Sequence, residues 1–343
     1  MPVLRRGVRA TILGAIGLLL LVLVSADAVA VTVEEYPELG SIIDRLVAEH
    51  HFNRTALTKL FAAATVRPEI VAAMERPHET LPWYTYRRLF INDERIRLGV
   101  HYWQEHKMVL DRAEREFGVP AELIVAIIGV ETRYGMKRGE YPTLDALVTL
   151  ALAYPRRAQF FRQELTDFLL LARELKVDAR TVRGSYAGAL GIPQFMPRSY
   201  RDYAVDFDQD RRRDLLGSSA DAIGSVANFL RRHGWIDGDP VIDPARAEAT
   251  LYSWPLKAAD EPLLRVRDWI SHGVFLQRER SRGKPVDDDR RAVLVTFEGE
   301  TGPLYYLAYD NFYVITRYNR SKNYAMAVYE LAQAIRRQYQ EPA

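Results

Sequence analysis

The most informative stretch of the chain is VPAELIVAIIGVETRYG, residues 119–135. Pro120 suits the first turn of a helix, and Gly135 suits the left-handed residue that ends one. Three isoleucines lie three, four and seven positions before Glu131 and share its helix face: Ile128, Ile127 and Ile124. The spacing therefore predicts a helix whose last turn carries a glutamate on an apolar stripe.

Two effects are expected to raise the pKa of Glu131. Desolvation disfavours the carboxylate, and the negative end of the helix dipole repels it. A carboxyl that stays protonated near neutral pH can donate a proton to a glycosidic oxygen. A glutamate at a helix end can also reach solvent and pair with Arg133. The residue pattern alone favours this second interpretation, because perturbed carboxylates are a minority.

The rest of the chain is expected to be mainly helical with a small β-rich part, a mainly α (α+β) fold. Apolar residues recur at helical spacing over much of 36–118, broken by Pro77, Pro82 and the aromatic run at 83–86. Further helices are expected at 143–153, 156–175 and 324–338.

The character of the sequence changes near residue 240. Strand formers dominate AVLVTF (292–297) and LYYLAY (304–309), which are separated by a Gly-bearing turn. The charged stretch between residue 240 and these strands is expected to be solvated loop. The predicted units are a helical body, a small β-rich subdomain and a C-terminal segment that returns to the body: 31–240, 241–310 and 311–343.

The first thirty residues are typical of a secretory signal peptide. Arg5, Arg6 and Arg9 precede an uncharged stretch at 10–26, and small residues with Ala-x-Ala spacing follow. The alternative is an uncleaved helix that anchors the protein in the inner membrane. Removing residues 1–30 takes away three Arg and one Asp, so the formal net charge falls from +2 to zero.

Charge and cysteine content exclude several classes of function. A neutral mature chain gives no electrostatic reason to expect a nucleic-acid partner. The sequence has no cysteine, which excludes disulfides, cysteine nucleophiles and a lipidated N-terminal cysteine. It also lacks the Gly-x-Ser-x-Gly nucleophile motif of serine hydrolases.

Several long motifs resemble those of the lytic murein transglycosylase B family and follow the same order. They are GVETRYG (129–135), YPRRA (154–158), GSYAGA (184–189), QFMP (194–197), DAIGSVAN (221–228), NFYVITRYN (311–319) and YAMAV (324–328). The resemblance covers nearly the whole chain after the leader and weakens only across about 240–300. The resemblance favours the catalytic interpretation of Glu131 over the solvent-exposed one, because Glu131 matches the family's lone catalytic acid/base.

This resemblance implies a periplasmic enzyme with a lysozyme-like core. It would cleave the β-1,4 bond between N-acetylmuramic acid (MurNAc) and N-acetylglucosamine (GlcNAc), leaving 1,6-anhydroMurNAc ends and requiring no cofactor. Its partners would be peptidoglycan glycan strands and cell-wall synthesis proteins, with the enzyme itself a monomer. The residues that match the family's sugar cleft are Tyr86, Arg156, Arg157, Ser185, Gln194, Tyr318, Asn319 and Tyr324.

A hydrolase that cut the same bond would need a second carboxylate. The nearest candidate on a predicted helix is Asp145. Thr143 is expected to be the N-cap of that helix, which places Asp145 in the first turn, where a negative charge favours the helix dipole. Asp145 is therefore interpreted as structural. A peptidoglycan-binding module is the remaining alternative, and it would need no perturbed carboxylate.

The segment at 206–217 resembles an EF-hand calcium loop, which this family can carry. Positions one, three and five are Asp206, Asp208 and Asp210. Position six, normally glycine, is Arg211, and position twelve, normally glutamate, is Gly217. Asp214 or Asp221 could supply a further ligand. The residues leave a structural calcium and a metal-free loop equally open.

Overall fold

A computed structural model describes most of the chain. The described residues are 31–32, 34–76, 81–247, 264–277 and 287–341. The predicted leader and Pro77 lie outside them. Within these ranges, no helix is both long enough and apolar enough to cross a membrane.

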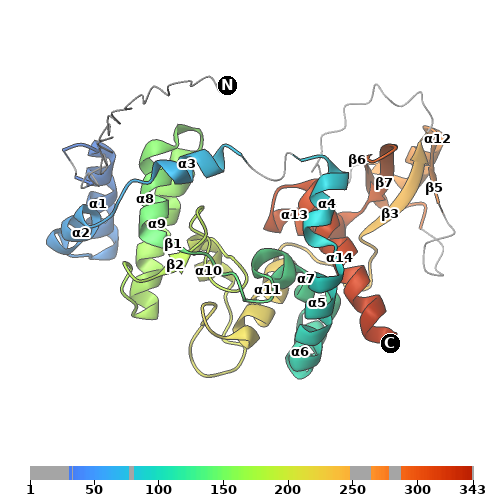
Figure 1. Ribbon diagram of the computed structural model, residues 1–343, viewed down its shortest axis with the longest axis horizontal. Coiled ribbons are helices and arrows are strands. Elements are labelled where there is room, and N and C mark those ends of the chain that lie inside the picture. The colour runs from blue at the N-terminus through green and yellow to red at the C-terminus, as the bar shows by residue number, and fades with distance from the viewer. Residues whose placement is uncertain (1–30, 33, 77–80, 248–263, 278–286, 342–343) are drawn as a thin grey trace, which may run out of the picture.

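Helices make up most of the described structure (Figure 1). They are α1 (Pro37–His50), α2 (Arg54–Ala62), α3 (Pro68–Met74), α4 (Trp83–Phe90), α5 (Asp93–Glu105), α6 (Lys107–Phe117), α7 (Ala121–Thr132), α8 (Thr143–Ala153), α9 (Ala158–Leu175), α10 (Pro197–Tyr203), α11 (Ser219–Arg232), α12 (Val266–Ser271), α13 (Asp310–Tyr318) and α14 (Lys322–Gln340).

The described strands form two antiparallel sheets. The strands are β1 (Tyr141–Pro142), β2 (Arg183–Gly184), β3 (Ile242–Ala247), β4 (Leu264–Arg265), β5 (Val274–Leu276), β6 (Arg291–Gly299) and β7 (Gly302–Ala308). β1 pairs with β2, and the larger sheet has the order β4-β6-β7-β3-β5. The β6–β7 hairpin closes at Gly299 opposite Gly302, as the Gly-bearing turn predicted.

Helix α7 is buried on every side from Ala121 to Gly129, because its residues there are almost all apolar. It packs against α5, α6, α11 and α14. The helix begins after Pro120, which is its N-cap, and ends at Thr132. The left-handed residue that stops it is Arg133, with φ 51°, so the prediction that Gly135 ends the helix was wrong. The amide N–H groups of Arg133 and Tyr134 bond the carbonyl oxygens of Gly129 and Ile128, which closes the helix two residues earlier.

The larger sheet joins the helical body through one face. Val295 and Phe297 of β6 belong to the main core, whereas Ala292 and Leu294 pack in a separate small cluster with Trp269 of α12. This alternation follows from the two-residue period of a strand. The sheet thereby places α13 and α14 back against the helical body, at one side of α7 (Figure 1).

Three further predictions about local structure were wrong. Residues 83–86 were expected to break the helical pattern but form the first turn of α4, because Trp83 and Tyr86 become buried there. The stretch from 240 to 291 was expected to be loop, yet its described part contains β3, β4, α12 and β5. Two parts of this stretch, residues 248–263 and 278–286, lie outside the described residues, and the second includes the charged segment Arg278–Arg282. The N-cap of α8 is Pro142, since Thr143 is already helical.

Candidate active site

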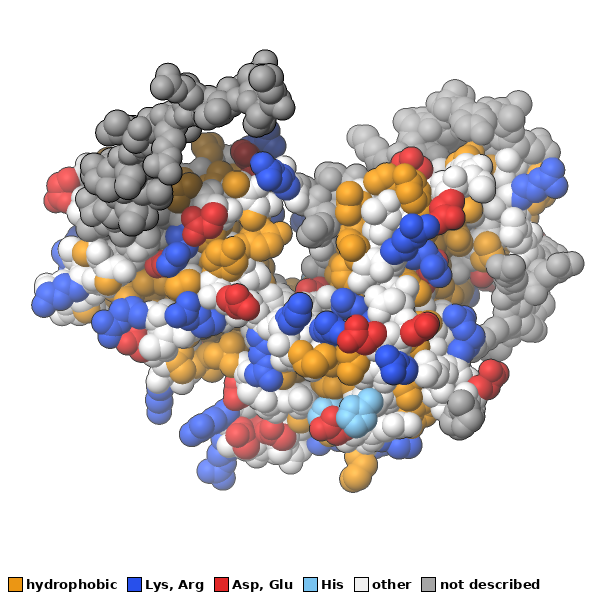
Figure 2. All heavy atoms as spheres, in the orientation of Figure 1, with side chains coloured by type: hydrophobic (Ala, Val, Ile, Leu, Met, Phe, Trp, Pro, Cys, Tyr) orange, Lys and Arg blue, Asp and Glu red, His pale blue; other side chains and the backbone are white. Residues whose placement is uncertain are grey.

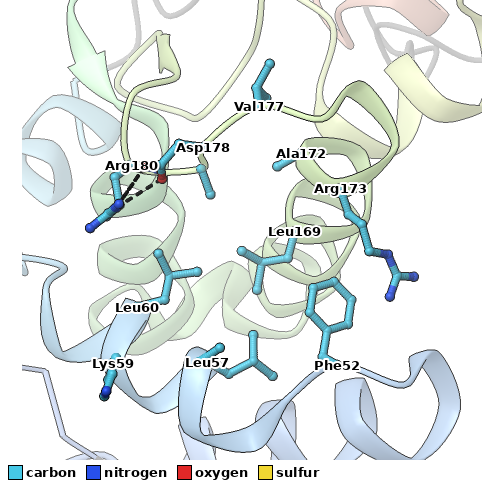
Figure 3. A pocket seen from close by; sticks show the side chains of 12 residues that line it. Phe52, Leu57, Lys59, Leu60, Leu169, Ala172, Arg173, Val177, Asp178 and Arg180 are labelled. Carbon is cyan, nitrogen blue, oxygen red and sulfur yellow. Dashed lines mark hydrogen bonds and ion pairs between the residues drawn. The ribbon is translucent and has the colours of Figure 1, made fainter.

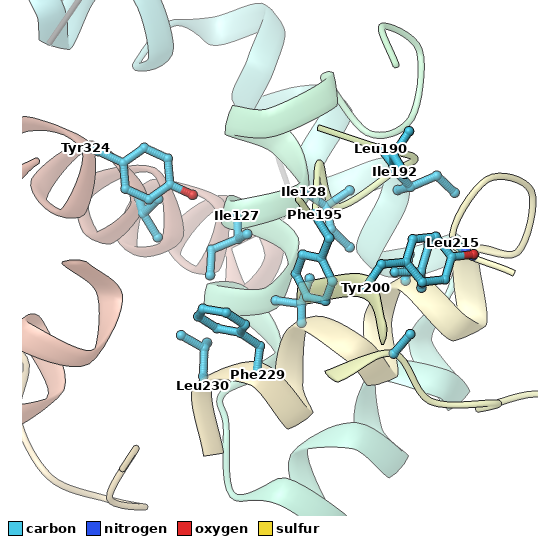
Figure 4. Close-up of a cluster of buried hydrophobic side chains, with 14 of the residues drawn as sticks. Ile127, Ile128, Leu190, Ile192, Phe195, Tyr200, Leu215, Phe229, Leu230 and Tyr324 are labelled. Atoms are coloured by element: carbon cyan, nitrogen blue, oxygen red, sulfur yellow. The ribbon is translucent and has the colours of Figure 1, made fainter. Parts of the chain in front are cut away.

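Glu131 lies in the last turn of α7, where the helix emerges from the core and the side chain becomes half-buried. Tyr324, in the first turn of α14, donates a hydrogen bond from its hydroxyl to Glu131 Oε1 at 2.6 Å. The Tyr324 ring packs in the core near Ile127 and points its hydroxyl toward α7 (Figure 4). One edge of the carboxyl group is therefore held by the protein.

Two more predicted tyrosines lie around Tyr324. The ring of Tyr318 is nearly parallel to that of Tyr324, with their centres 6.3 Å apart. The Tyr318 hydroxyl donates to the carbonyl oxygen of Pro193 at 2.6 Å. Tyr86 and Tyr324 each expose only 2% of their surface, so their rings contact protein. Tyr86 packs against Phe90 of its own helix, with ring centres 5.1 Å apart.

Burial keeps these phenols protonated. Desolvation, and then the negative charge of Glu131, raise the pKa of Tyr324 well above its ordinary value. The same two causes raise the pKa of Tyr318. Because a protonated phenol can donate its hydrogen, Tyr324 remains a donor to Glu131 at every pH near neutrality.

The chain reverses directly after Glu131, and four contacts of the neighbouring residues fix that reversal. Gly129 has no side chain because the ring of Tyr134 occupies the space: a Cβ there would lie 2.7 Å from the ring. The Tyr134 hydroxyl donates to the carbonyl oxygen of Arg95 at 2.7 Å, and the Arg95 guanidinium donates to that of Gly129 at 2.5 Å. Thr132, fully buried, donates to the carbonyl oxygen of Ile192 at 2.7 Å.

Ser185 and Gln194 lie on the loop that Thr132 contacts. The Ser185 hydroxyl oxygen accepts the amide N–H of Ala189 at 3.0 Å, which leaves its hydrogen to donate. Gln194 has φ 52°, and its side-chain amide donates to the carbonyl oxygens of Gly191 and Arg138 at 2.8 and 3.0 Å. The Gln194 carbonyl oxygen is therefore the part of that side chain that can accept a hydrogen bond from a ligand.

The remaining predicted cleft residues lie at helix ends. Arg156 and Arg157 are exposed in a short 3-10 helix at Pro155–Arg157, just before α9. The Arg157 guanidinium lies over the ring of Phe160 at 4.3 Å. Asn319 follows the last residue of α13 and is half-buried. The predicted role of these three residues in the site rests on the family pattern.

Asp145 is engaged elsewhere. Its carboxylate accepts hydrogen bonds from the amide N–H of Thr65 at 3.1 Å and from Arg67 Nε at 2.9 Å, and Arg67 Nη2 lies 2.8 Å away in the same ion pair. It exposes only 7% of its surface. The contacts fit the structural role predicted for Asp145, since they tie α8 to the segment before α3.

The aspartates of the predicted calcium loop divide into two groups. Carboxylate oxygens of Asp206, Asp208 and Asp210 lie within 4.8 Å of one another. Asp214 points elsewhere and accepts the amide N–H groups of Leu216 and Gly217, both at 2.9 Å. Asp221 is fully buried and accepts backbone amides of the loop, so neither residue completes the cluster.

An apolar cavity of about 470 Å³ lies between α2 and α9 (Figure 3). Its lining includes Leu57, Leu60 and Leu169, and its one acidic side chain, Asp178, is paired with Arg180. None of the predicted site residues lines it. It is therefore separate from the carboxylate chemistry. A second cavity, of about 250 Å³, is lined by Gln194 and Tyr318 and adjoins the site.

Acidic and basic side chains are both scattered over the face of the molecule shown in Figure 2.

Comparison with known families matches residues 35–333 to the transglycosylase SLT domain. The chain is 38% identical over 309 residues to membrane-bound lytic murein transglycosylase B of Escherichia coli K12, covering 87% of this chain and 82% of that protein. The chain therefore belongs to the SLT transglycosylase family.

Solved structures agree with this assignment. Soluble lytic transglycosylase SltB1 from Pseudomonas aeruginosa has 43% identity and a TM-score of 0.81, covering 89% of this chain and all of that one. Escherichia coli Slt35 in complex with calcium has 37% identity and a TM-score of 0.82, over 92% and 99% of the two chains. SltB3 from Pseudomonas aeruginosa, with NAG-anhNAM-pentapeptide, has 30% identity and a TM-score of 0.74, over 89% and 80%.

The protein is thus a lytic transglycosylase with a lysozyme-like fold, as the sequence motifs predicted. It cleaves the glycan strand of peptidoglycan at the MurNAc–GlcNAc bond and leaves anhydroMurNAc ends.

Sequence reasoning missed the residues that hold Glu131 in place. Thr132 and Tyr134 were seen only as parts of a motif, and Arg95 was not singled out. Their roles depend on contacts between α5, α7 and the loop at 184–195. The one local signal was Gly129, a glycine inside a helix, which indicates close approach by another group.

Proposed function

We propose that Glu131 carries out both proton transfers of the reaction, first as acid and then as base. The observation that carries this proposal is the 2.6 Å hydrogen bond from Tyr324 to Glu131 Oε1. It orients a half-buried carboxyl group at the end of a buried helix, beside a cavity lined by Gln194 and Tyr318. General acid–base catalysis needs a carboxyl group that is held in one orientation.

The proposed reaction uses no water. Glu131 gives its proton to the glycosidic oxygen, the bond from that oxygen to C1 of MurNAc breaks, and the GlcNAc hydroxyl leaves. The carbonyl oxygen of the substrate's own N-acetyl group bonds to C1, which takes the place of a carboxylate nucleophile. The ionised Glu131 then removes the proton of the MurNAc C6 hydroxyl. O6 attacks C1 within the same sugar, the N-acetyl oxygen departs, and Glu131 is protonated again.

The test is Glu131→Gln with product analysis in oxygen-18 water. Glutamine keeps the volume and the acceptor for Tyr324 but has no proton to give, so turnover is expected to fall by at least about 100-fold. Products of the unchanged enzyme should be anhydro ends without label. Mainly reducible, labelled MurNAc ends would instead establish a hydrolase, and normal turnover by a folded variant would remove Glu131 from the mechanism.

We propose that Asp206, Asp208 and Asp210 hold a structural calcium ion. Buried Asp206 Oδ1 has no hydrogen-bond partner in the described structure. A carboxylate oxygen of this kind is a suitable ligand for a hard cation such as calcium. Arg211 takes the left-handed conformation, φ 72°, that a glycine normally takes at position six, so the loop keeps its sharp turn. The related Slt35 structure with calcium supports the same assignment.

The calcium proposal predicts a rise of the melting temperature with calcium and a fall with a chelator, without change in the products. Asp206→Asn is the variant to compare. A melting temperature that is independent of calcium in the unchanged protein would show that the loop is metal-free.

We also propose that residues 1–30 export the protein to the periplasm, where its substrate lies, and that the substrate carries peptides like the pentapeptide bound by SltB3. The support is the sequence pattern of a basic, then apolar, then small-residue segment. N-terminal sequencing of the mature protein decides between cleavage and an intact anchor.

A further inference from the structure

The cavity of about 250 Å³ beside the site contains charged groups that the reaction does not use. Gln194 and Tyr318 line one side of this cavity, and the phenol of Tyr318 interacts electrostatically with Glu131. The other side is built by α9, α10, α11 and α13, and its side chains include Phe160, Glu164, Arg198, Asp202, His233 and Arg317.

Glu164 has a buried carboxyl group that forms no ion pair with another described residue. It exposes 3% of its surface and lines the cavity. Its Oε2 accepts the amide N–H of Arg198 at 3.0 Å, and Oε1 accepts no hydrogen bond in the described structure. Desolvation, with a smaller contribution from Asp167, raises the pKa of Glu164 to about 7, against the effect of Arg198 and Arg157.

Within the described residues, the other four buried acidic side chains all have stronger partners than Glu164. Asp145 binds Arg67, Asp167 binds Arg201 and Glu122 binds Arg336, at 2.8, 2.5 and 2.8 Å. Asp221 has no arginine but accepts amide N–H groups of Phe207 and Asp214, both at 2.6 Å. Glu164 accepts one hydrogen bond, from a single amide N–H. A cationic group of a ligand could therefore supply the charged partner that this carboxylate lacks.

Positive charge lies at the exposed side of the same cavity. The Arg198 side chain is 63% exposed, and its Nε lies 3.6 Å from Asp202. Arg317 lies over the ring of Tyr313 at 5.7 Å. Burial, followed by the charges of Arg317 and Arg232, lowers the pKa of His233, which is therefore neutral near pH 7. A buried carboxyl group and exposed guanidinium groups in one cavity complement an ammonium group close to a carboxylate.

We propose that this cavity binds the peptide attached to the glycan strand, and that Glu164 accepts a hydrogen bond from a primary ammonium group of that peptide. The inference rests on the proposed function, because it requires a peptide-bearing strand in the cleft at Gln194 and Tyr318. Phe160, 38% exposed, offers an apolar surface to the peptide chain. Glu164 is thus a specificity-determining residue, and strand cleavage itself does not depend on it.

The experiment compares three substrates: strands with free peptide amines, the same strands after N-acetylation, and strands stripped of peptides. For the unchanged enzyme, acetylation should raise KM about tenfold, the minimum for loss of a charge-assisted hydrogen bond. Glu164→Gln should raise KM about tenfold on free-amine strands and abolish the difference between free and acetylated strands. Its kcat and KM on peptide-free strands should be unchanged.

Two controls separate this role from a structural one. Glutamine at 164 keeps an acceptor for Arg198, and Glu116→Gln removes a carboxylate from the distant helix α6, where it pairs with Arg112. Equal loss on all three substrates, or retained discrimination in Glu164→Gln, would overturn the proposal. If the variant does not fold, the enzyme without substitutions still tests the proposal. The same KM on acetylated and free-amine strands would then overturn the proposal. If the enzyme without substitutions failed to cut even the peptide-free strands, that result would instead count against the proposed function.

Discussion

Replacing Asp145 by asparagine separates a structural carboxylate from a catalytic one. The carboxylate accepts two hydrogen bonds, one from Thr65 and one from Arg67 Nε, and forms an ion pair with the Arg67 guanidinium, whose side chain is two-thirds buried. Asparagine keeps an oxygen for Thr65 but turns an N–H₂ group toward Arg67, so the ion pair is lost. Breaking a buried pair costs about 3–5 kcal/mol, and the partial exposure of Arg67 reduces this to about 2–3 kcal/mol.

The assay has two parts: urea unfolding for the free energy, and muropeptide release at 25 °C by folded protein. Asp44→Asn is the matched control, because Asp44 pairs with Arg54 at an exposed site and should lose less than about 1 kcal/mol. We expect Asp145→Asn to be less stable by about 2–3 kcal/mol with kcat within about twofold of the unchanged enzyme. A folded Asp145→Asn protein with kcat reduced about 100-fold would refute the single-carboxylate mechanism.

Three further predictions follow from the geometry. Tyr324→Phe keeps the ring and removes the donor to Glu131, so kcat should fall about 10- to 100-fold with little change in melting temperature, measured by muropeptide release and thermal melts. Gly129→Ala places a Cβ 2.7 Å from the Tyr134 ring, and the overlap should destabilise the protein by about 1–2 kcal/mol in urea unfolding despite alanine's better helix propensity. The pKa of Glu164 rises from 4.5 to about 7 on folding, so the free energy of unfolding should decrease as the pH rises between these values. At 1.36 kcal/mol per pKa unit, the decrease is up to about 3 kcal/mol. Glu164→Gln should remove this decrease in denaturation curves taken from pH 4 to 8.

Helix α7 and strands β6 and β7 were predictable because their sequence signals are local. Apolar residues at helical spacing and a proline at the start were enough to predict α7. The strand formers at 292–297 and 304–309 likewise predicted β6 and β7.

Elements stabilised by distant partners were not predictable in this way. Residues 83–86 have poor helix propensity, yet α4 forms because α14 and β6 cover it. Strand β3 has the unremarkable sequence IDPARA, and its hydrogen bonds to β7 on one side and β5 on the other define it. Glu164 could not be singled out either, because no sequence pattern shows which arginine each buried carboxylate will meet.

The turn after Glu131 shows how the fold and the site depend on each other. Arg133, Tyr134 and Gly135 all have positive φ, of 51°, 62° and 82°. Each non-glycine residue in this conformation costs about 1–2 kcal/mol, so the turn needs support from elsewhere. Thr132 bonding Ile192, and the Tyr134 hydroxyl bonding α5, provide it. Because these bonds end α7 one residue after Glu131, they also place its carboxyl group within reach of Tyr324. The contacts that hold a strained turn therefore orient the proposed catalytic group.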